Sequence, residues 1–245
     1  MQPFVSVLMP TYNRRKFIPA AIEIYKNQTY SKQRMEWVIF DDGTDKVEDL
    51  FKEASKTIPN IRYIYQSEKV NVGAKRNRLL KEAKGEIIVW MDDDDYYPPT
   101  RVSNVVTSLS KNKTIDIVGS SQLYLYYTDT KKICTVGPFS PTHGTNGTIG
   151  IRSQFAKKRK YDESVTFAEE ASYFNNFTLP MAQLEPMKTM LVICHNANTY
   201  DKKIIRGDYG DKYQKNPTFK ETDLKLRDFI KEPKLRDFYN NLTPN

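Results

Sequence analysis

The sequence predicts an α/β protein in which helices flank a mostly parallel central sheet, with a smaller antiparallel part after it. Short apolar runs alternate with stretches of helical spacing, and each run is typical of a strand covered on both faces. Only short connections separate them, as in doubly wound sheets. Ligands of such sheets bind beyond the carboxyl ends of the strands. Three of these ends carry polar clusters, at residues 10–14, 41–45 and 92–95.

Each element follows from its own pattern. Four strands are expected in the first part, at residues 4–10, 36–43, 61–67 and 86–92. Helical spacing fills the intervals, at residues 17–28, 46–56 and 73–85. In the second part we expect strands at 115–127 and 131–139, a Gly/Thr-rich loop entering a strand at 143–151, a short helix at 167–177 and a last strand at 188–195. The polar tail repeats "KLRDF", which indicates a short amphipathic helix, a proline break and another helical turn.

The composition is that of an ordinary soluble chain. Of the 245 residues, 39% are hydrophobic and 28% are charged, and no run of roughly 18 apolar residues predicts a membrane-spanning helix. Cys134 and Cys194 form neither a disulfide framework nor a zinc-ligand set, so we expect a reducing, cytoplasmic location. The N-terminus begins directly with a strand and lacks the order of a signal peptide.

The net charge of +8 suits an anionic partner such as a nucleotide, a nucleic acid or a membrane surface. The basic residues are scattered, apart from one cluster at residues 157–160. Scattered lysines indicate a solvated surface, so we expect no nucleic-acid binding, while a peripheral membrane location stays open.

The most unusual stretch is "GEIIVWMDDDDYYPP", residues 85–99, in which an apolar run ends in four aspartates. Adjacent carboxylates raise the cost of ionising one another. A solvated turn is one explanation, but this run begins where a buried strand ends. Alternate residues of an extended chain turn to one side, so Asp92 and Asp94 are the natural pair of ligands for Mg²⁺ or Mn²⁺. Asp93 then lies opposite, and Asp95 bonds nearby backbone.

Several ordered segments resemble the nucleotide-sugar glycosyltransferases of the GT-A fold, family 2. They are "VSVLMPTYNR" (5–14), "WVIFDDGTD" (37–45), "NVGAKRNRLLKEAKGEIIVWMDDDD" (71–95) and "FAEEASYF" (167–174). The resemblance is dense up to residue 100 and thin beyond it. It implies a GT-A, Rossmann-like sheet and the inverting transfer of a hexosyl or deoxyhexosyl group to a hydroxyl of a glycan or glycoconjugate acceptor. It also implies three parts: a donor-binding half (1–100), an acceptor-side half with the catalytic base (101–206) and a polar helical tail (207–245).

The resemblance implies that residues 92–94 are a DxD motif. Asp92 then faces the ribose or the metal, Asp93 joins the donor site, and Asp94 is the principal metal ligand. A Mn²⁺ or Mg²⁺ ion bridges the donor diphosphate and neutralises the leaving nucleotide. We therefore expect this run to be poorly ordered without metal and diphosphate. In some relatives a histidine placed like His195 is a further metal ligand, although a lone histidine at a strand end can simply be hydrogen-bonded.

The loop "PTYNR" resembles the segment that wraps the nucleotide. The resemblance implies that Pro10, Thr11 and Tyr12 lie along base and ribose and that Arg14 belongs to the same donor site. Core packing is the alternative for Tyr12.

The segments after the second and third strands complete the donor site that the resemblance implies. Asp42 accepts the N3–H of uracil, which favours a UDP-sugar donor, whereas Asp41 can equally cap the following segment. Gly73 permits a close approach of the donor, and Lys75 or Arg76 lies near its base or its phosphate. Solvent exposure is the alternative for these two basic side chains.

The pair "EE" at 169–170 resembles the Glu-Asp pair at the acceptor site of the family. In inverting members the second acid is the general base that deprotonates the acceptor hydroxyl. That position is Glu170, and its extra methylene leaves the choice between Glu169 and Glu170 open. Two acids that begin a helix are otherwise favoured by the helix dipole.

Other classes fit the sequence less well. A nucleotidyl- or phosphotransferase on a similar sheet lacks a Walker-type Gly-rich loop here. A non-catalytic nucleotide-sugar or glycan-binding module does not need the acids at 94 and 170. A glycosidase needs two facing carboxylates but neither a nucleotide nor a metal.

Overall fold

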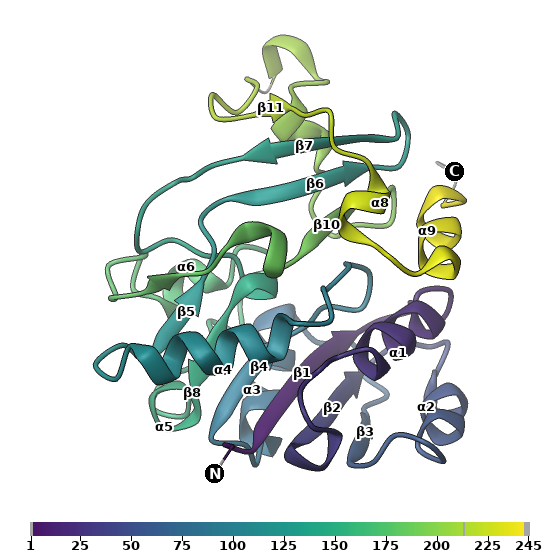
Figure 1. The fold of residues 1–245 in the computed structure, drawn as a ribbon, viewed down its shortest axis with the longest axis vertical. Coiled ribbons are helices and arrows are strands. Elements are labelled where there is room, and N and C mark those ends of the chain that lie inside the picture. The colour runs from purple at the N-terminus through teal and green to yellow at the C-terminus, as the bar shows by residue number, and fades with distance from the viewer. Residues whose placement is uncertain (1, 213, 243–245) are drawn as a thin grey trace.

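The computed structural model describes residues 2–212 and 214–242 and contains two β-sheets with helices around them (Figure 1). The larger sheet has seven strands in the order β3-β2-β1-β4-β8-β5-β9. Their bounds are β1 Val5–Thr11, β2 Met35–Asp41, β3 Ile61–Tyr65, β4 Ile87–Trp90, β5 Ile117–Gly119, β8 Gly150–Arg152 and β9 Ala182–Gln183. The strands β1 to β4 are parallel to one another, whereas β8 is antiparallel to β4. The predicted α/β class with a mostly parallel sheet is confirmed.

Alternating side chains of the parallel strands build two cores. Val5 and Val7 of β1 belong to one core, which α1 (Ile18–Lys26), α2 (Glu48–Ala54) and α4 (Arg101–Lys111) cover. Leu8 of the same strand belongs to the other, which α3 (Val72–Glu82) covers. Because both faces are covered, these strands carry apolar residues on both. The polar pair on the second face is buried, with the Ser6 hydroxyl donating to Glu36 at 2.5 Å.

The smaller sheet has the order β10-β6-β7-β11 and lies beside the carboxyl ends of the parallel strands (Figure 1). Its strands are β6 Leu123–Tyr127, β7 Lys132–Val136, β10 Leu191–Cys194 and β11 Lys220–Glu221. The remaining short helices are α5 Ser153–Ala156, α6 Glu170–Tyr173, α7 Lys203–Arg206, α8 Leu226–Phe229 and α9 Pro233–Asn240, with 3-10 turns at Lys32–Arg34, Asn146–Thr148, Pro186–Lys188 and Gly210–Lys212.

The single strand expected at 115–127 is wrong, because the chain changes sheets within it. Strand β5 belongs to the larger sheet and β6 to the smaller one. Between them, the backbone N–H of Ser120 donates to the Thr148 hydroxyl at 3.1 Å, and that of Ser121 donates to the Gln183 side chain at 2.7 Å. Side-chain oxygens thus accept the backbone N–H groups that would bond a neighbouring strand if the strand were continuous.

Helix α4 was not predicted from the sequence. Its buried residues Val102, Val105, Val106 and Leu109 follow the i, i+3, i+4, i+7 spacing of an amphipathic helix. The apolar spacing of a helix was therefore present in the sequence, although Ser, Thr and Asn between these positions weaken helix propensity.

The polar tail packs onto the rest of the molecule. Its two "KLRDF" copies form α8 and α9, separated at Pro233, as expected. Leu226 and Phe229 of the first copy and Leu235 of the second are buried in the same core as β1. The Tyr239 hydroxyl donates to the Asp95 carbonyl at 3.2 Å, so the tail contacts the acidic run. Among the residues that the structure describes, no helix is long and apolar enough to cross a membrane.

Gly73 is the tightest backbone contact of α3. A Cβ at this position would lie 2.1 Å from the carbonyl oxygen of Asp162. We therefore expect Gly73→Ala to lower the free energy of unfolding by about 1–3 kcal/mol, the usual cost of overpacking. Thermal denaturation checks this, with Arg78→Ala on the exposed face of the same helix as the control. A Gly73→Ala melting temperature equal to that of the control would contradict the prediction.

Candidate active site

A cavity of about 600 Å³ opens at the carboxyl ends of β1 and β4, next to the smaller sheet. Its lining brings together segments far apart in the sequence: residues 10–12, Arg14, Lys75, Arg76, 92–95, 145–147, 166–170 and 198–200. Of the predicted donor and catalytic residues, Asp42 and Gly73 are not among its lining residues. A volume of this size holds a nucleotide-sized ligand.

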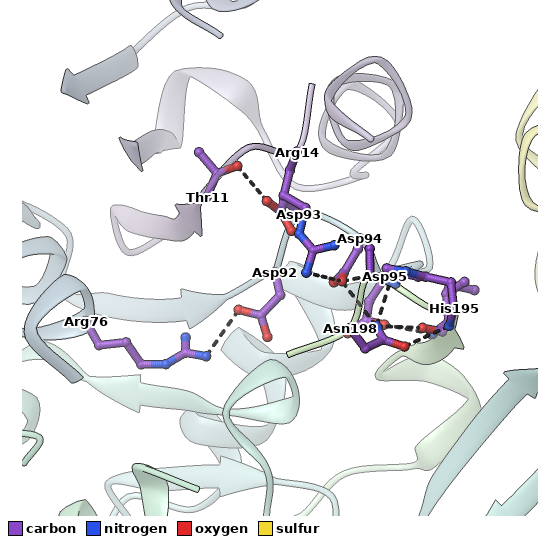
Figure 2. Close-up of polar contacts among 11 residues, drawn as sticks. Thr11, Arg14, Arg76, Asp92, Asp93, Asp94, Asp95, His195 and Asn198 are labelled. Atoms are coloured by element: carbon purple, nitrogen blue, oxygen red, sulfur yellow. Dashed lines mark hydrogen bonds and ion pairs between the residues drawn. The ribbon is translucent and has the colours of Figure 1, made fainter. Parts of the chain in front are cut away.

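The acidic run forms one wall of this cavity, and each carboxylate has a protein partner (Figure 2). Arg76 Nη2 lies 3.3 Å from Asp92 Oδ1, and the Thr11 hydroxyl donates to Asp93 at 2.6 Å. Asp95 accepts the Ile193 backbone N–H at 2.8 Å, the backbone bond that was expected for it. The run is therefore held by contacts within the protein, whereas its dependence on metal and diphosphate for order stays a prediction.

Asp94 lies beside an arginine and a histidine. Arg14 Nη2 lies 3.7 Å and His195 Nε2 lies 3.1 Å from its Oδ2 (Figure 2). Burial alone would raise the pKa of Asp94, but the hydrogen bond from His195 and the charge of Arg14 outweigh it and hold this pKa below its usual range.

The neighbours of Asp94 respond to its charge. Burial and the Asp94 charge raise the pKa of Asp93 to about 8, and the same two causes raise that of Asp95 well above its usual range. Burial also raises the pKa of Asp92, against the opposing charge of Arg76. Repulsion within the run is thus relieved by favouring protonation at Asp93 and Asp95, while the ionised form is favoured at Asp94.

His195 lies against Phe17, with ring centroids 4.6 Å apart, and points Nε2 at Asp94. Its Nδ1 accepts the backbone N–H of Ala197 at 3.1 Å. A neutral imidazole that accepts at Nδ1 carries its proton on Nε2, so His195 donates to Asp94 in this structure. Metal ligation through Nε2 would require the Ala197 bond to break.

Among the described residues, no three or more His, Cys, Asp or Glu side chains are grouped to hold a metal ion. Asp92 and Asp94 nevertheless both line the cavity, and their side chains are 25% and 12% exposed. Carboxylate oxygens suit Mg²⁺ and Mn²⁺, and Mg²⁺ usually keeps waters and substrate phosphates as its other ligands. The donor set therefore fits a divalent ion held by few protein groups.

Asp42 lies beneath the cavity wall. Its side chain is fully buried, lies 2.5 Å from Lys75 Nζ and accepts the Val70 backbone N–H at 2.8 Å. Lys75 in turn lies 5.1 Å from the centroid of the Tyr12 ring, and Lys69 Nζ lies 4.4 Å from it. Tyr12 thus lines the cavity, with two ammonium groups near its ring, rather than packing in the core. Lys75, which lines the cavity, thus contacts Asp42, which does not.

The Asp41 carboxylate, next to Asp42 in the chain, accepts hydrogen bonds from the backbone. It accepts the N–H groups of Gly43 and Val47, at 2.8 and 3.2 Å, and the Tyr63 hydroxyl at 2.5 Å. The loop into α2 is held in this way.

Arg76 connects the acidic run to Glu169. Besides Asp92, its guanidinium bonds Glu169, with Nε 2.5 Å from Oε1, and both side chains are buried. Asn146 also donates to Glu169 at 2.8 Å. Glu169 is therefore engaged by an ion pair and a hydrogen bond.

Glu170 lines the same cavity but is less constrained. Its contact with Asn146 is 3.5 Å long. Burial, followed by the charge of Glu169, raises the pKa of Glu170 to about 7. A carboxyl group whose pKa lies near neutrality and which faces a cavity is suited to accept a proton.

Asn146 is a site residue that the sequence analysis missed. It holds both glutamates and accepts the Tyr161 hydroxyl at 2.8 Å. The fully buried Arg101 of α4 positions this loop by donating to the carbonyls of Gly147 and Ile149, at 3.1 and 3.0 Å. The only signal in the sequence was the Gly/Thr-rich loop at 143–151, which identifies no single residue.

The fold is that of the GT-A glycosyltransferases. A mannosyltransferase of Pyrobaculum calidifontis, solved with GDP-Man and Mn²⁺, superposes with a TM-score of 0.67 at 16% identity, over 85% of this chain and 62% of that one. S. aureus TarS in complex with UDP-GlcNAc superposes with a TM-score of 0.59 at 19% identity, over 80% of this chain and 60% of that one.

Residues 6–171 match the family model for glycosyl transferase family 2, and the chain belongs to this family. An uncharacterized glycosyltransferase of Methanocaldococcus jannaschii is 27% identical over 189 residues, which is 71% of this chain and 64% of that protein. The minor teichoic acid biosynthesis protein GgaB of Bacillus subtilis is 34% identical over 115 residues, which is 46% of this chain and 13% of that protein. The chain thus spans less than two thirds of the length of these relatives.

Proposed function

We propose that this protein is a metal-dependent inverting glycosyltransferase that moves a sugar from a nucleotide-sugar donor to a hydroxyl of a glycan or glycoconjugate. The observation that carries the proposal is Glu170, a carboxyl group with a pKa raised to about 7 that faces the same cavity as the acidic run. Family membership and the two nucleotide-sugar complexes of similar fold support it.

In this proposal the nucleotide lies along Pro10, Thr11 and Tyr12, near Lys75. Asp94, with Asp92, would hold a Mn²⁺ or Mg²⁺ ion, which would neutralise charge on the departing nucleotide. Arg14 lies beside Asp94 and adds positive charge there.

Glu170 takes the proton of the acceptor hydroxyl as that oxygen attacks the anomeric carbon from the side opposite the diphosphate, which inverts the configuration. Arg76 bridges Asp92 and Glu169 and so keeps the donor side and the base side at a constant separation. Asn146 orients the two glutamates.

A thermal-shift screen of UDP-, GDP- and dTDP-sugars, each with and without Mn²⁺, tests the donor. A ligand that binds only the native state raises the melting temperature by mass action. We expect a UDP-sugar to give the largest shift and the shift to need Mn²⁺. Slow hydrolysis of the same donor without acceptor would distinguish the enzyme from a non-catalytic binding module. A screen with no shift for any nucleotide-sugar would overturn the proposal.

Asp42→Ala should weaken UDP-sugar binding by about 1–3 kcal/mol, the cost of removing a charged hydrogen-bond partner and leaving another group unpaired. In this structure the unpaired group is the Lys75 ammonium, so the effect acts through Lys75 even if Asp42 never touches uracil. Calorimetric titration with UDP and GDP measures it. A lower affinity for UDP alone would support direct recognition of uracil by Asp42. Equal losses of affinity for UDP and GDP would assign the effect to Lys75. Unchanged affinities would show that other residues recognise the base.

A further inference from the structure

The exposed aromatic residues of the described chain are concentrated at the mouth of the cavity. Only three large hydrophobic side chains are exposed among the residues that the structure describes: Phe139 at 43%, Phe167 at 59% and Tyr209 at 44%. Phe139 and Phe167 both line the cavity, whereas Tyr209 is not among its lining residues. Exposed apolar surface beside a binding cavity indicates a contact site for a ligand.

Each of these phenylalanines is paired with a second aromatic ring in the same lining. The Phe139 and His143 ring centroids lie 4.7 Å apart, and those of Phe167 and Tyr200 lie 6.3 Å apart. Burial lowers the pKa of His143, which favours its uncharged ring at neutral pH. The two rings of each pair are tilted, with 53° between the planes of Phe139 and His143 and 41° between those of Phe167 and Tyr200. Each pair thus borders the cavity with two separate ring faces.

Phe167 lies close in sequence to Glu170, the proposed base, and a residue with an unusual backbone conformation lies between them. Ala168 has φ +55°, a left-handed conformation that costs a residue with a Cβ about 1–2 kcal/mol. Only Ala168 and Glu169 separate Phe167 from Glu170 in the chain. Such strain persists where the surrounding structure demands it and is concentrated at functional sites.

The polarity of the cavity mouth distinguishes between two kinds of ligand. The aliphatic side chains of the wall, such as Leu125 and Val192, are buried at 0% and 5% exposure, so the exposed apolar surface comes from aromatic rings. Side chains that can form hydrogen bonds adjoin these rings in the lining, namely Thr145, Thr166 and Thr199. A flat ring bordered by hydroxyl groups matches a pyranose, whose C–H groups face the negative π surface while its hydroxyls point sideways. An aliphatic lipid chain would need a continuous exposed apolar track instead.

We propose that Phe139 with His143, and Phe167 with Tyr200, are stacking platforms for sugar rings of the acceptor, which is therefore an oligosaccharide. This inference rests on the proposed transferase function. It assigns the acceptor site to aromatic residues outside the segments of the donor site.

The test measures binding of maltotriose, cellotriose and chitotriose by saturation-transfer NMR and calorimetry, with UDP and Mn²⁺ present. We expect at least one trisaccharide to bind. Phe139→Ala and Phe167→Ala should each weaken that binding by about fivefold or more, in line with the usual worth of an aromatic contact. Phe167→Trp retains a flat ring and should bind within about twofold of the wild type, whereas Phe167→Leu keeps apolar area without a ring and should resemble Phe167→Ala. Tyr209→Ala is the matched control, an exposed aromatic residue outside the cavity lining.

Binding of farnesyl phosphate that survives Phe167→Leu would instead identify a lipid acceptor and overturn the proposal. Absence of binding for all three trisaccharides would also overturn it. The nucleotide-sugar screen on the same preparations tests the transferase function separately from the oligosaccharide acceptor. A donor that stabilises the protein while trisaccharides fail leaves the transferase function standing, whereas failure of every donor removes that function itself.

Discussion

Replacing Asp94 with alanine should reduce sugar transfer by at least about 10³-fold and abolish metal-dependent donor binding, because a bound cation supplies several kcal/mol of charge stabilisation. Asp94 is the aspartate of the run whose pKa is held below the usual range, so it is the carboxylate best prepared to hold a cation near neutral pH. The measurement is the transfer rate together with calorimetric UDP binding, each with and without Mn²⁺.

The fold should survive this change. Removing the Asp94 charge eliminates a cause that raises the pKa of both Asp93 and Asp95, so repulsion within the run falls. Arg14 and His195 both keep their contact with Phe17. We expect the free energy of unfolding to change by about 1 kcal/mol or less. Asp116→Ala, at a partly exposed carboxylate that pairs with Arg152, is the control. Full activity of the Asp94→Ala protein in EDTA would refute the metal assignment.

Glu170→Gln should lower the transfer rate by roughly 10²–10⁴, the usual contribution of a positioned general base, with donor affinity nearly unchanged. Glutamine keeps the shape of the side chain but cannot take the proton of the acceptor hydroxyl. Donor binding and product formation are measured on the same preparation, and NMR reads the anomeric configuration of the product. A retained configuration would overturn the proposed inversion.

The pKa of Glu170 predicts the pH dependence. A general base must be ionised, so wild-type activity should rise as the pH increases through about 7 and be lost below it. Stability follows the opposite direction. Since the pKa is 4.5 in the unfolded chain and about 7 in the folded one, the folded state binds the proton more tightly between these values. Stability therefore falls as the pH rises through this window, and Glu170→Gln should raise the melting temperature at pH 8.

Glu169→Gln is the comparison for this result. We expect this variant to have a smaller effect on the rate, because neighbouring helical side chains point about 100° apart. The structure adds that Glu169 is buried in an ion pair with Arg76, so its replacement should chiefly destabilise the fold, by about 1–3 kcal/mol. Rates are therefore compared per folded molecule. An inactive but folded Glu169 variant beside an active Glu170 variant would reverse the assignment.

The parallel half of the fold and the end of its sheet that carries the cavity could be predicted from the sequence alone. Apolar periodicity is local, and the strands at 4–10 and 86–92 correspond to β1 and β4 within a few residues. The rule that ligands bind at carboxyl ends then predicted the place of the acidic run. The division of 115–127 into two strands was not predictable in this way, because it depends on hydrogen bonds from Thr148 and Gln183, which are distant in sequence.

The roles within the site were decided by tertiary contacts. Four identical aspartates have the same local sequence signal, yet the hydrogen bond from His195 and the charge of Arg14 favour the ionised form of Asp94, while burial and the Asp94 charge favour protonation of Asp93. The two adjacent glutamates both line the cavity, but Arg76 and Asn146 bond Glu169 closely, whereas the contact of Glu170 with Asn146 is 3.5 Å long. A pKa depends on burial and on charges brought close by folding, so the sequence could name the acids but only the packed structure could distinguish among them.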